Sequence, residues 1–217
     1  MSLTLVIGSK NYSSWSLRAW IFLKHLGIEF DERMLTLYSP EFYEEIGKIS
    51  PARRVPVLLD GDLRIWDSLA ICEYLAEKTG RGWPKDTAAR AHARAISAEM
   101  HSGFQALRDA CPFNARARNR HVPRTPELLA SARRIDQLWE DCRRRFGRGG
   151  PWLVGEYSIV DAMYAPVVLR FNTYGADLSA PSRDYANTVL ADPPLVDWLR
   201  AAESEPHRVE AIDAIGR

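Results

Sequence analysis

Cysteine is scarce in this 217-residue chain: Cys72, Cys111 and Cys142 lie far apart, and no C-x-x-C pair occurs. An odd number of separated cysteines argues against a disulfide framework, a metal cluster and dithiol redox chemistry, so we expect buried thiols and no metal. Long apolar runs are also missing. The start M-S-L-T-L-V-I-G lacks a basic stretch before an apolar core. We therefore expect no membrane span, no signal peptide and a cytoplasmic location.

The sequence also lacks an excess of positive or negative charge. Lysine and arginine number 29 against 28 aspartates and glutamates, which creates no general field for nucleic acid or an anionic membrane. The chain is 46% hydrophobic and 26% charged. A chain of this length and composition buries a sizeable core and suits one large or two small domains.

Residues 1–80 alternate between strand and helix patterns. The expected strands cover residues 3–7, 30–35, 57–59 and 63–66, and the expected helices cover residues 14–26, a short segment after Ser39-Pro40, and residues 69–77. In the first helix, apolar residues recur at spacings of three and four and Gly27 provides a stop. The order β-α-β-α-β-β-α matches a thioredoxin-like domain.

Strand signals nearly vanish after a short linker at residues 81–86. Residues 87–217 are rich in alanine and arginine at helical spacing, so we expect an all-helical bundle there, with one helix over Ala88–Leu107. Thr125-Pro126 is a typical helix start. Ser158 and Asp161 lie three residues apart at another start, where we expect them to cap a buried helix without a chemical role.

The stretch from Arg54 to Leu75 carries the clearest sign of a binding site. Two short strands are joined through Asp60-Gly61-Asp62, and Pro56, which opens the first, is a candidate for a cis peptide bond. Asp67-Ser68 then precede a helix. Free backbone N–H groups at a helix start, together with a serine hydroxyl, can hold a carboxylate.

These residues, V-P-V-L followed by D-S-L-A-I-C-E-Y-L, resemble the glutathione-binding domain of the glutathione transferase family. The resemblance implies that the backbone of Val55, before Pro56, pairs with the cysteinyl part of glutathione, and that Asp67 and Ser68 bind its γ-glutamyl end. Arg54 either reaches the glutathione carboxylates or is only solvated. In the alternative structural interpretation, Pro56 merely ends a strand and Ser68 merely caps a helix.

The glutathione thiol would be activated at the start of the first helix. There S-S-W-S-L-R is similar to the S-S-C-S-x-R motif of the zeta class, with Trp15 at the cysteine position, and we include Trp15 in the glutathione site. A serine hydroxyl and a helix N-terminus favour the reactive thiolate. Ser13 is the first candidate for this donor and Ser14 the second, although both also suit simple N-capping. Tyr12 is a third hydroxyl. Arg18, one helical turn in from Ser14, is expected in a structural ion pair, and its position beside the site leaves a substrate-facing role as the alternative.

The helical domain would shape the pocket for a small electrophilic co-substrate, with residues 101–114 and the loop that follows overhanging the first domain. Arg108, Arg116, Arg118, Arg120, Arg124 and His121 lie in this region, either facing an anionic co-substrate or forming a solvated loop. The resemblance implies a homodimer, with the 88–107 helix and the Tyr74–Lys78 edge as contact surfaces. We expect a glutathione transferase; the alternatives are a glutathione-dependent cis-trans isomerase, such as a maleylacetoacetate isomerase, and a non-catalytic binding module.

Overall fold

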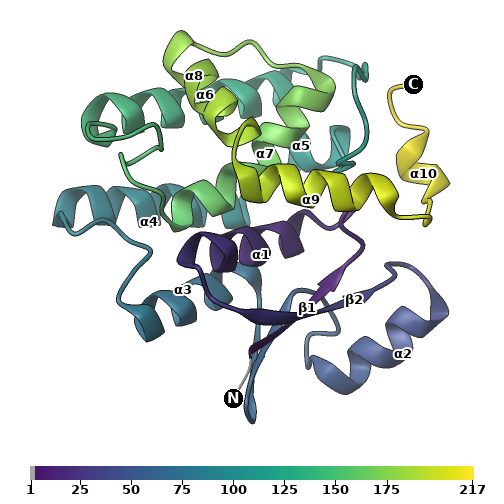
Figure 1. Cartoon of the computed structure of the whole chain (residues 1–217). Helices are drawn as coiled ribbons and strands as arrows, with labels where there is room; N and C mark the ends of the chain where they lie inside the picture. Colours follow the sequence, from purple (N-terminus) through teal and green to yellow (C-terminus); the bar gives the residue numbers. More distant parts are fainter. Residues whose placement is uncertain (1–2) are drawn as a thin grey trace.

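A four-stranded sheet forms the lower part of the molecule in Figure 1, a computed structural model that describes residues 3–217. Met1 and Ser2, which open the expected first domain, lie outside the described residues. The elements of this part are β1 (Leu3–Gly8), α1 (Ser14–Leu26), β2 (Phe30–Leu35), α2 (Pro40–Ile49), β3 (Val57–Asp60), β4 (Leu63–Trp66) and α3 (Ser68–Thr79). The strand order is β2-β1-β3-β4, in which β1 and β2 are parallel and the other pairs antiparallel. The predicted thioredoxin-like domain is confirmed.

The central strand β1 is buried on both faces, and its alternation separates two clusters of apolar side chains. Leu5 and Ile7 belong to the cluster that contains α1 and α3, whereas Val6 belongs to the cluster that contains α2. The sheet is therefore covered by helices on both sides (Figure 1). Helix α1 ends where predicted, since Gly27 takes the left-handed conformation with φ of 68°.

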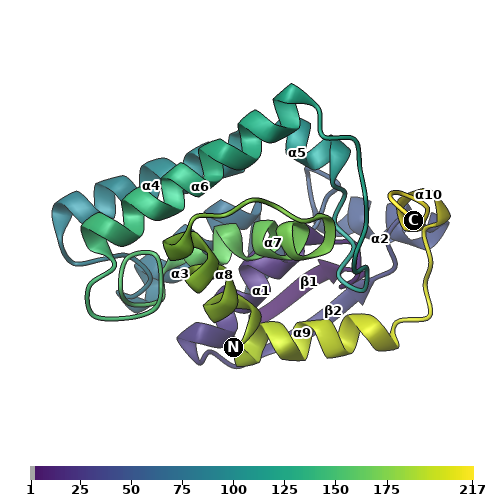
Figure 2. The same ribbon diagram turned by 90° about the horizontal axis from the view of Figure 1, so that it is seen from above.

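The second part of the described chain is helical. Its elements are α4 (Thr87–Ser102), α5 (Gln105–Ala110), α6 (Pro126–Phe146), α7 (Ile159–Tyr174), α8 (Ala180–Leu190), α9 (Pro193–Ser204) and α10 (Glu210–Asp213). Helix α7 packs against α1, α4 and α8, and α4 lies beside α6 along one edge of the molecule (Figure 2). Nearly every residue of α7 is buried, so this helix joins the cores of the two parts.

Two predicted helix starts are confirmed. The Thr125 hydroxyl accepts the N–H of Leu128 at the start of α6. At the start of α7, Ser158 and Asp161 form a capping box in which the Asp161 carboxylate accepts the Ser158 N–H at 2.9 Å. The same carboxylate accepts the N–H of Leu153 at 3.1 Å, so it also holds the preceding turn. Asp161 is 1% exposed.

The single helix predicted over Ala88–Leu107 is wrong in its last turn. Helix α4 ends at Ser102, and α5 begins at Gln105. Between them Gly103 donates its N–H to the carbonyl of Glu99, and a Cβ on this glycine would lie 2.8 Å from that same carbonyl oxygen. The next residue, Phe104, is left-handed with φ of 62°. The chain therefore bends here, and α5 starts in a new direction.

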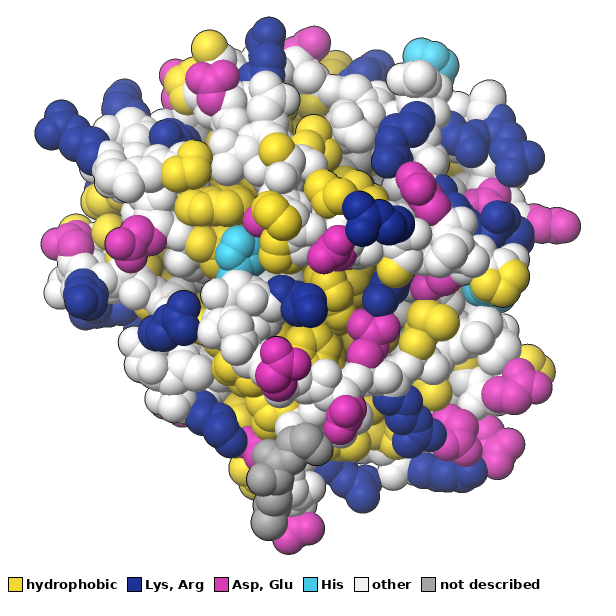
Figure 3. Space-filling view, in the orientation of Figure 1, with side chains coloured by type: hydrophobic (Ala, Val, Ile, Leu, Met, Phe, Trp, Pro, Cys, Tyr) yellow, Lys and Arg dark blue, Asp and Glu magenta, His cyan; other side chains and the backbone are white. Residues whose placement is uncertain are grey.

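Cationic and anionic side chains are interspersed on the face shown in Figure 3, in keeping with the balanced composition. None of the helices in residues 3–217 is long and apolar enough to cross a membrane. The three cysteines are buried and free, as predicted. Burial raises the pKa of Cys111 to about 11 and that of Cys142 to about 12, and also raises the pKa of Cys72, so these thiols are unreactive at neutral pH.

Candidate functional site

One cavity of about 300 Å³ lies where the sequence predicts a binding site. It opens between the start of α1, the turn before β3 and the start of α3. Its walls are Trp15, Ala52, Arg54, Val55, Pro56, Trp66, Asp67 and Ser68, which include all six residues predicted to bind glutathione. Residues from three separate segments thus come together around a space large enough for part of a small peptide.

The turn before β3 forms one wall of this cavity. The Val55–Pro56 peptide bond is cis, as the sequence suggested. Pairing with β1 begins only at Val57, and no hydrogen bond within residues 3–217 uses the backbone of Val55. Its N–H and carbonyl therefore remain available to an extended ligand. Arg54 is exposed and also makes no hydrogen bond to the described residues.

Asp67 and Ser68 form another part of the wall. Asp67 caps α3 with a positive φ of 75°, and one of its carboxylate oxygens accepts the N–H of Leu69 at 2.9 Å and of Ala70 at 3.2 Å. Its other oxygen lies 3.1 Å from Nε2 of His101, on α4. Burial alone would raise the pKa of Asp67, but these hydrogen bonds outweigh burial and hold it below its usual value. The Ser68 hydroxyl is buried and has no partner among the described residues.

The two candidate serines lie beside the cavity but do not line it. Ser13 is the N-cap of α1: its hydroxyl donates to Oγ of Ser16 at 2.7 Å and accepts the Ser16 N–H at 3.3 Å. Ser14 is the first residue of the helix, is 6% exposed, and its hydroxyl makes no hydrogen bond to residues 3–217. The next residue, Trp15, reaches the cavity wall. The Ser13 hydroxyl thus caps the helix, whereas the Ser14 hydroxyl has no partner within the described part of the chain.

Tyr12 has a structural role that the sequence did not reveal. Its hydroxyl donates to Asp213 at 2.9 Å and accepts hydrogen bonds from Arg116 at 2.9 Å and from the Val209 N–H at 3.0 Å. The backbone of the preceding loop is held as well, since Glu205 accepts the N–H groups of residues 10 and 11. The loop before Ser13 is therefore fixed by the C-terminal segment. The Tyr12 hydroxyl donates one hydrogen bond and accepts two, so it has no hydrogen-bonding capacity left for a ligand.

The arginines near the site differ from expectation. Arg18 was expected in an ion pair, but it has no carboxylate partner among the described residues; its guanidinium stacks on the indole of Trp15, 4.5 Å from the ring centroid. Four arginines of the overhanging region donate to backbone carbonyls: Arg108, Arg116, Arg118 and Arg124. These four guanidinium groups are thus engaged by the backbone, although Arg118, Arg124 and the neighbouring His121 are exposed, as expected of a solvated loop.

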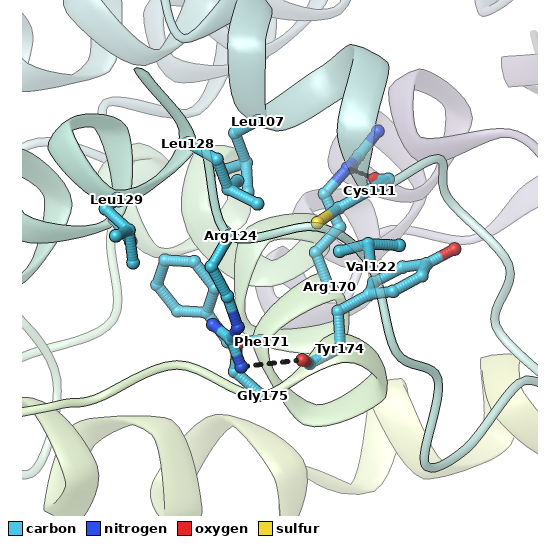
Figure 4. A pocket seen from close by; sticks show the side chains of 11 residues that line it. Leu107, Cys111, Val122, Arg124, Leu128, Leu129, Arg170, Phe171, Tyr174 and Gly175 are labelled. Atoms are coloured by element: carbon cyan, nitrogen blue, oxygen red, sulfur yellow. Dashed lines mark hydrogen bonds between the residues drawn. The ribbon is translucent and has the colours of Figure 1, made fainter. Parts of the chain in front are cut away.

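Two other cavities contain none of the predicted glutathione residues. The one in Figure 4, between α5, α6 and α7, measures about 10 Å³, and Arg170 on its wall donates to the Cys111 carbonyl. This space holds at most one water molecule. A wider recess of about 910 Å³ lies where residues 80–89 face residues 145–158. The site predicted from the sequence is thus separate from both.

Comparison with known proteins agrees with this geometry. Residues 12–78 match the family model described as glutathione S-transferase, N-terminal domain. A probable maleylacetoacetate isomerase from Caenorhabditis elegans is 31% identical over 186 residues, which cover 83% of this chain and 85% of that protein. Glutathione S-transferase theta-3 of the mouse is 28% identical over 199 residues, or 86% of this chain and 76% of that protein.

Among solved structures, a glutathione transferase homolog from Burkholderia with bound glutathione has the same fold. Its TM-score is 0.71 at 22% identity, and the match covers 94% of this chain and 100% of that one. The fold in common is a thioredoxin-like sheet domain followed by a helical domain. The chain belongs to the glutathione S-transferase family, as its motifs predicted.

Proposed function

We propose that this protein is a glutathione S-transferase that binds glutathione in the 300 Å³ cavity and activates its thiol at the start of α1. The observation that carries this proposal is the convergence of the unpaired Val55 backbone with Asp67 and Ser68 in one cavity beside that helix start. The Val55 backbone would pair with the cysteinyl part, and Asp67 and Ser68 would bind the γ-glutamyl end. Arg54, exposed and unpaired at the rim, would reach a glutathione carboxylate.

The chemistry follows from this placement. A glutathione thiol has a pKa near 8.5 and is mostly protonated at neutral pH, so the site must favour the thiolate. The Ser14 hydroxyl and the backbone N–H groups of the first helical turn would donate to the sulfur. The thiolate would then attack an electrophilic carbon, forming a carbon–sulfur bond as the leaving group departs with its electron pair. Ser13, as N-cap, would hold this helix turn in place.

The rest of the molecule completes the proposal. Residues 1–80 would bind glutathione, residues 81–86 would link the domains, and residues 87–217 would shape the electrophile pocket. We also infer a cytoplasmic homodimer whose contacts include the α3 edge at Tyr74–Lys78 and helix α4, with glutathione and a small electrophile as its partners and neither nucleic acid nor membrane among them.

Thiolate absorbance tests this proposal directly. The purified protein titrated with glutathione should show an ultraviolet difference signal of bound thiolate at neutral pH, with an apparent thiol pKa at least one unit below about 8.5. It should also conjugate chlorodinitrobenzene. Binding of glutathione without ionisation would refute the transferase mechanism and favour the binding-module alternative.

A second candidate function is glutathione-dependent cis-trans isomerisation. The S-S-x-S-x-R spacing and the 31% identical Caenorhabditis elegans relative, named a probable maleylacetoacetate isomerase, favour it. The same thiolate would add to a conjugated double bond, allow rotation about the resulting single bond, and leave unchanged. Trp15 in place of the motif cysteine argues against it. Turnover of maleylacetoacetate by the purified protein would decide between the two.

His101 provides a prediction about glutathione binding, because it reaches Asp67 from the helical domain. The His101→Phe variant keeps a ring against Trp15, 5.3 Å away, but removes the hydrogen bond to Asp67. We expect the half-saturating glutathione concentration to rise about threefold to fivefold, as for the loss of one partly exposed hydrogen bond, with kcat nearly unchanged.

A matched control is His92→Phe, on the same helix and outside the cavity walls. It should leave the glutathione dependence unchanged. Equal kinetic effects of the two variants would show that the Asp67 contact does not contribute to binding.

A further inference from the structure

Arg18 is a buried cation that has no neutralising partner in the described part of the chain. Only 1% of the residue is exposed, and its Nε and Nη1 atoms are buried with no hydrogen-bond partner among residues 3–217. No carboxylate of the described chain lies within ion-pair distance of it. Burying an unpaired charge costs several kcal/mol, so a fold that retains one gives up stability at this position. Such uncompensated groups concentrate where function requires them.

The charged groups around Arg18 do not neutralise it. Burial, with repulsion from Arg108 on α5 and Arg170 on α7, lowers the pKa of Arg18 to about 9, which leaves the guanidinium charged at neutral pH. Cys72 on α3 faces it as a neutral thiol, because burial raises the pKa of that group. Asp67, which precedes α3, is the one carboxylate that attracts it, but its oxygens are already bonded to α3 and to His101.

The position of Arg18 brings this charge close to the proposed thiolate. Residues four apart on a helix share one face, and helical side chains tilt toward the N-terminus, so Arg18 lies over the turn that begins at Ser14. Its guanidinium stacks on Trp15, and Trp15 lines the glutathione cavity. The indole of Trp15 therefore connects the cavity with the buried guanidinium of Arg18, and the partly buried guanidinium of Arg108 lies 4.8 Å from the centroid of the same ring. Burial keeps water from screening the charge of Arg18.

We propose that Arg18 acts on bound glutathione through its electric field. Its unpaired guanidinium lies over the Trp15 indole, does not contact glutathione, and favours the thiolate form of the bound thiol. This inference rests on the proposed function, since it assumes that glutathione binds in the cavity with its sulfur at the start of α1. The thiolate of bound glutathione would then be the anion that the positive charges of Arg18, Arg108 and Arg170 attract.

The test uses Arg18→Met, a neutral side chain of similar length, with Arg33→Met as the matched control, because Arg33 is exposed and pairs with Glu45. In Arg18→Met the apparent pKa of bound glutathione, followed by thiolate absorbance, should rise by about one unit or more, a roughly tenfold loss of thiolate at neutral pH. Affinity for S-methylglutathione, which has no ionisable thiol, should change less than twofold. The melting temperature of Arg18→Met should equal or exceed that of the unmodified protein, because the substitution removes a buried unpaired charge.

Each other result overturns the inference. An unchanged thiol pKa shows that Arg18 does not act on the sulfur. An equal loss of affinity for S-methylglutathione assigns Arg18 to the glutathione carboxylates, and a melting temperature several degrees lower assigns it to the core. Arg18→Gln serves as a second neutral variant if Arg18→Met fails to fold. If the unmodified protein binds glutathione without ionising it, the proposed function itself fails, which the titration of that protein reveals separately.

Discussion

Replacing Ser14 by alanine is expected to lower kcat/KM for conjugation about a hundredfold, the typical effect of losing one donor to a developing or bound anion. Ser14 is the first residue of α1, and its hydroxyl makes no hydrogen bond to residues 3–217 that would occupy its proton. The thiolate absorbance of bound glutathione at neutral pH should fall in parallel, whereas binding of S-methylglutathione should be nearly unchanged.

Ser13→Ala is the matched control for this experiment. Ser13 caps α1 through its bonds with Ser16, so its removal should cost about 1 kcal/mol of stability and lower the melting temperature by a few degrees. Most of the thiolate absorbance of bound glutathione should remain in Ser13→Ala. If Ser13→Ala abolishes the signal and Ser14→Ala keeps it, the roles of the two serines are the reverse of our proposal.

Replacing Asp161 by alanine is expected to lower the free energy of unfolding by about 3 kcal/mol, because hydrogen bonds to a buried charged group contribute roughly 1.5–3 kcal/mol each. The carboxylate accepts the N–H groups of Ser158 and Leu153, and both would be left buried without a partner. The melting temperature should fall by roughly 10 °C in a chain of this size. Thermal unfolding followed by circular dichroism would measure it.

An exposed carboxylate is the control for Asp161. Asp197, on the surface of α9, forms its one ion pair within residues 3–217 with Arg200, and its replacement by alanine should change the unfolding free energy by less than about 0.5 kcal/mol. Equal effects at the two positions would contradict a special role for the buried cap.

Asp161 also predicts how the stability of the protein depends on pH. Burial raises the pKa of Asp161 from its ordinary 3.8 to about 6, so the folded protein binds this proton more tightly than the unfolded chain does. The part of the stability that comes from binding this proton is therefore fully present below pH 4 and is lost as the pH rises through 6, whereas the hydrogen bonds from Ser158 and Leu153 remain at neutral pH. Asp161→Asn should remove this part of the pH dependence, which chemical denaturation at several pH values would show.

Local features of this protein were predictable because their causes are local. The turn at Gly61, the strand end at Pro56 and the caps at Ser13 and Thr125 each depend on neighbouring residues, and all of them form as the sequence indicates. Most walls of the cavity come from a strand-turn-helix motif contained within 22 residues, although Trp15 and Ala52 lie outside it. That these residues bind glutathione stays a prediction.

Contacts between distant segments were not predictable in this way. Nothing next to His101 in the sequence indicates that it meets Asp67, and nothing next to Tyr12 indicates that it meets Asp213. The ion pair expected for Arg18 was wrong for the same reason, because the groups that surround it come from three other helices. Pairing of charges across a fold depends on packing, which periodicity in one segment does not encode.

The bonds that join Tyr12 to Asp213 and Val209 connect the two ends of the chain. A disturbance of residues 209–213 would therefore be transmitted to the loop that leads into Ser13, next to the proposed place of thiol activation. The turn at Val55 and Pro56, proposed to bind glutathione, has no hydrogen bond to those residues within the described chain. Loss of order in this distant segment would thus weaken the activation of glutathione more than its binding.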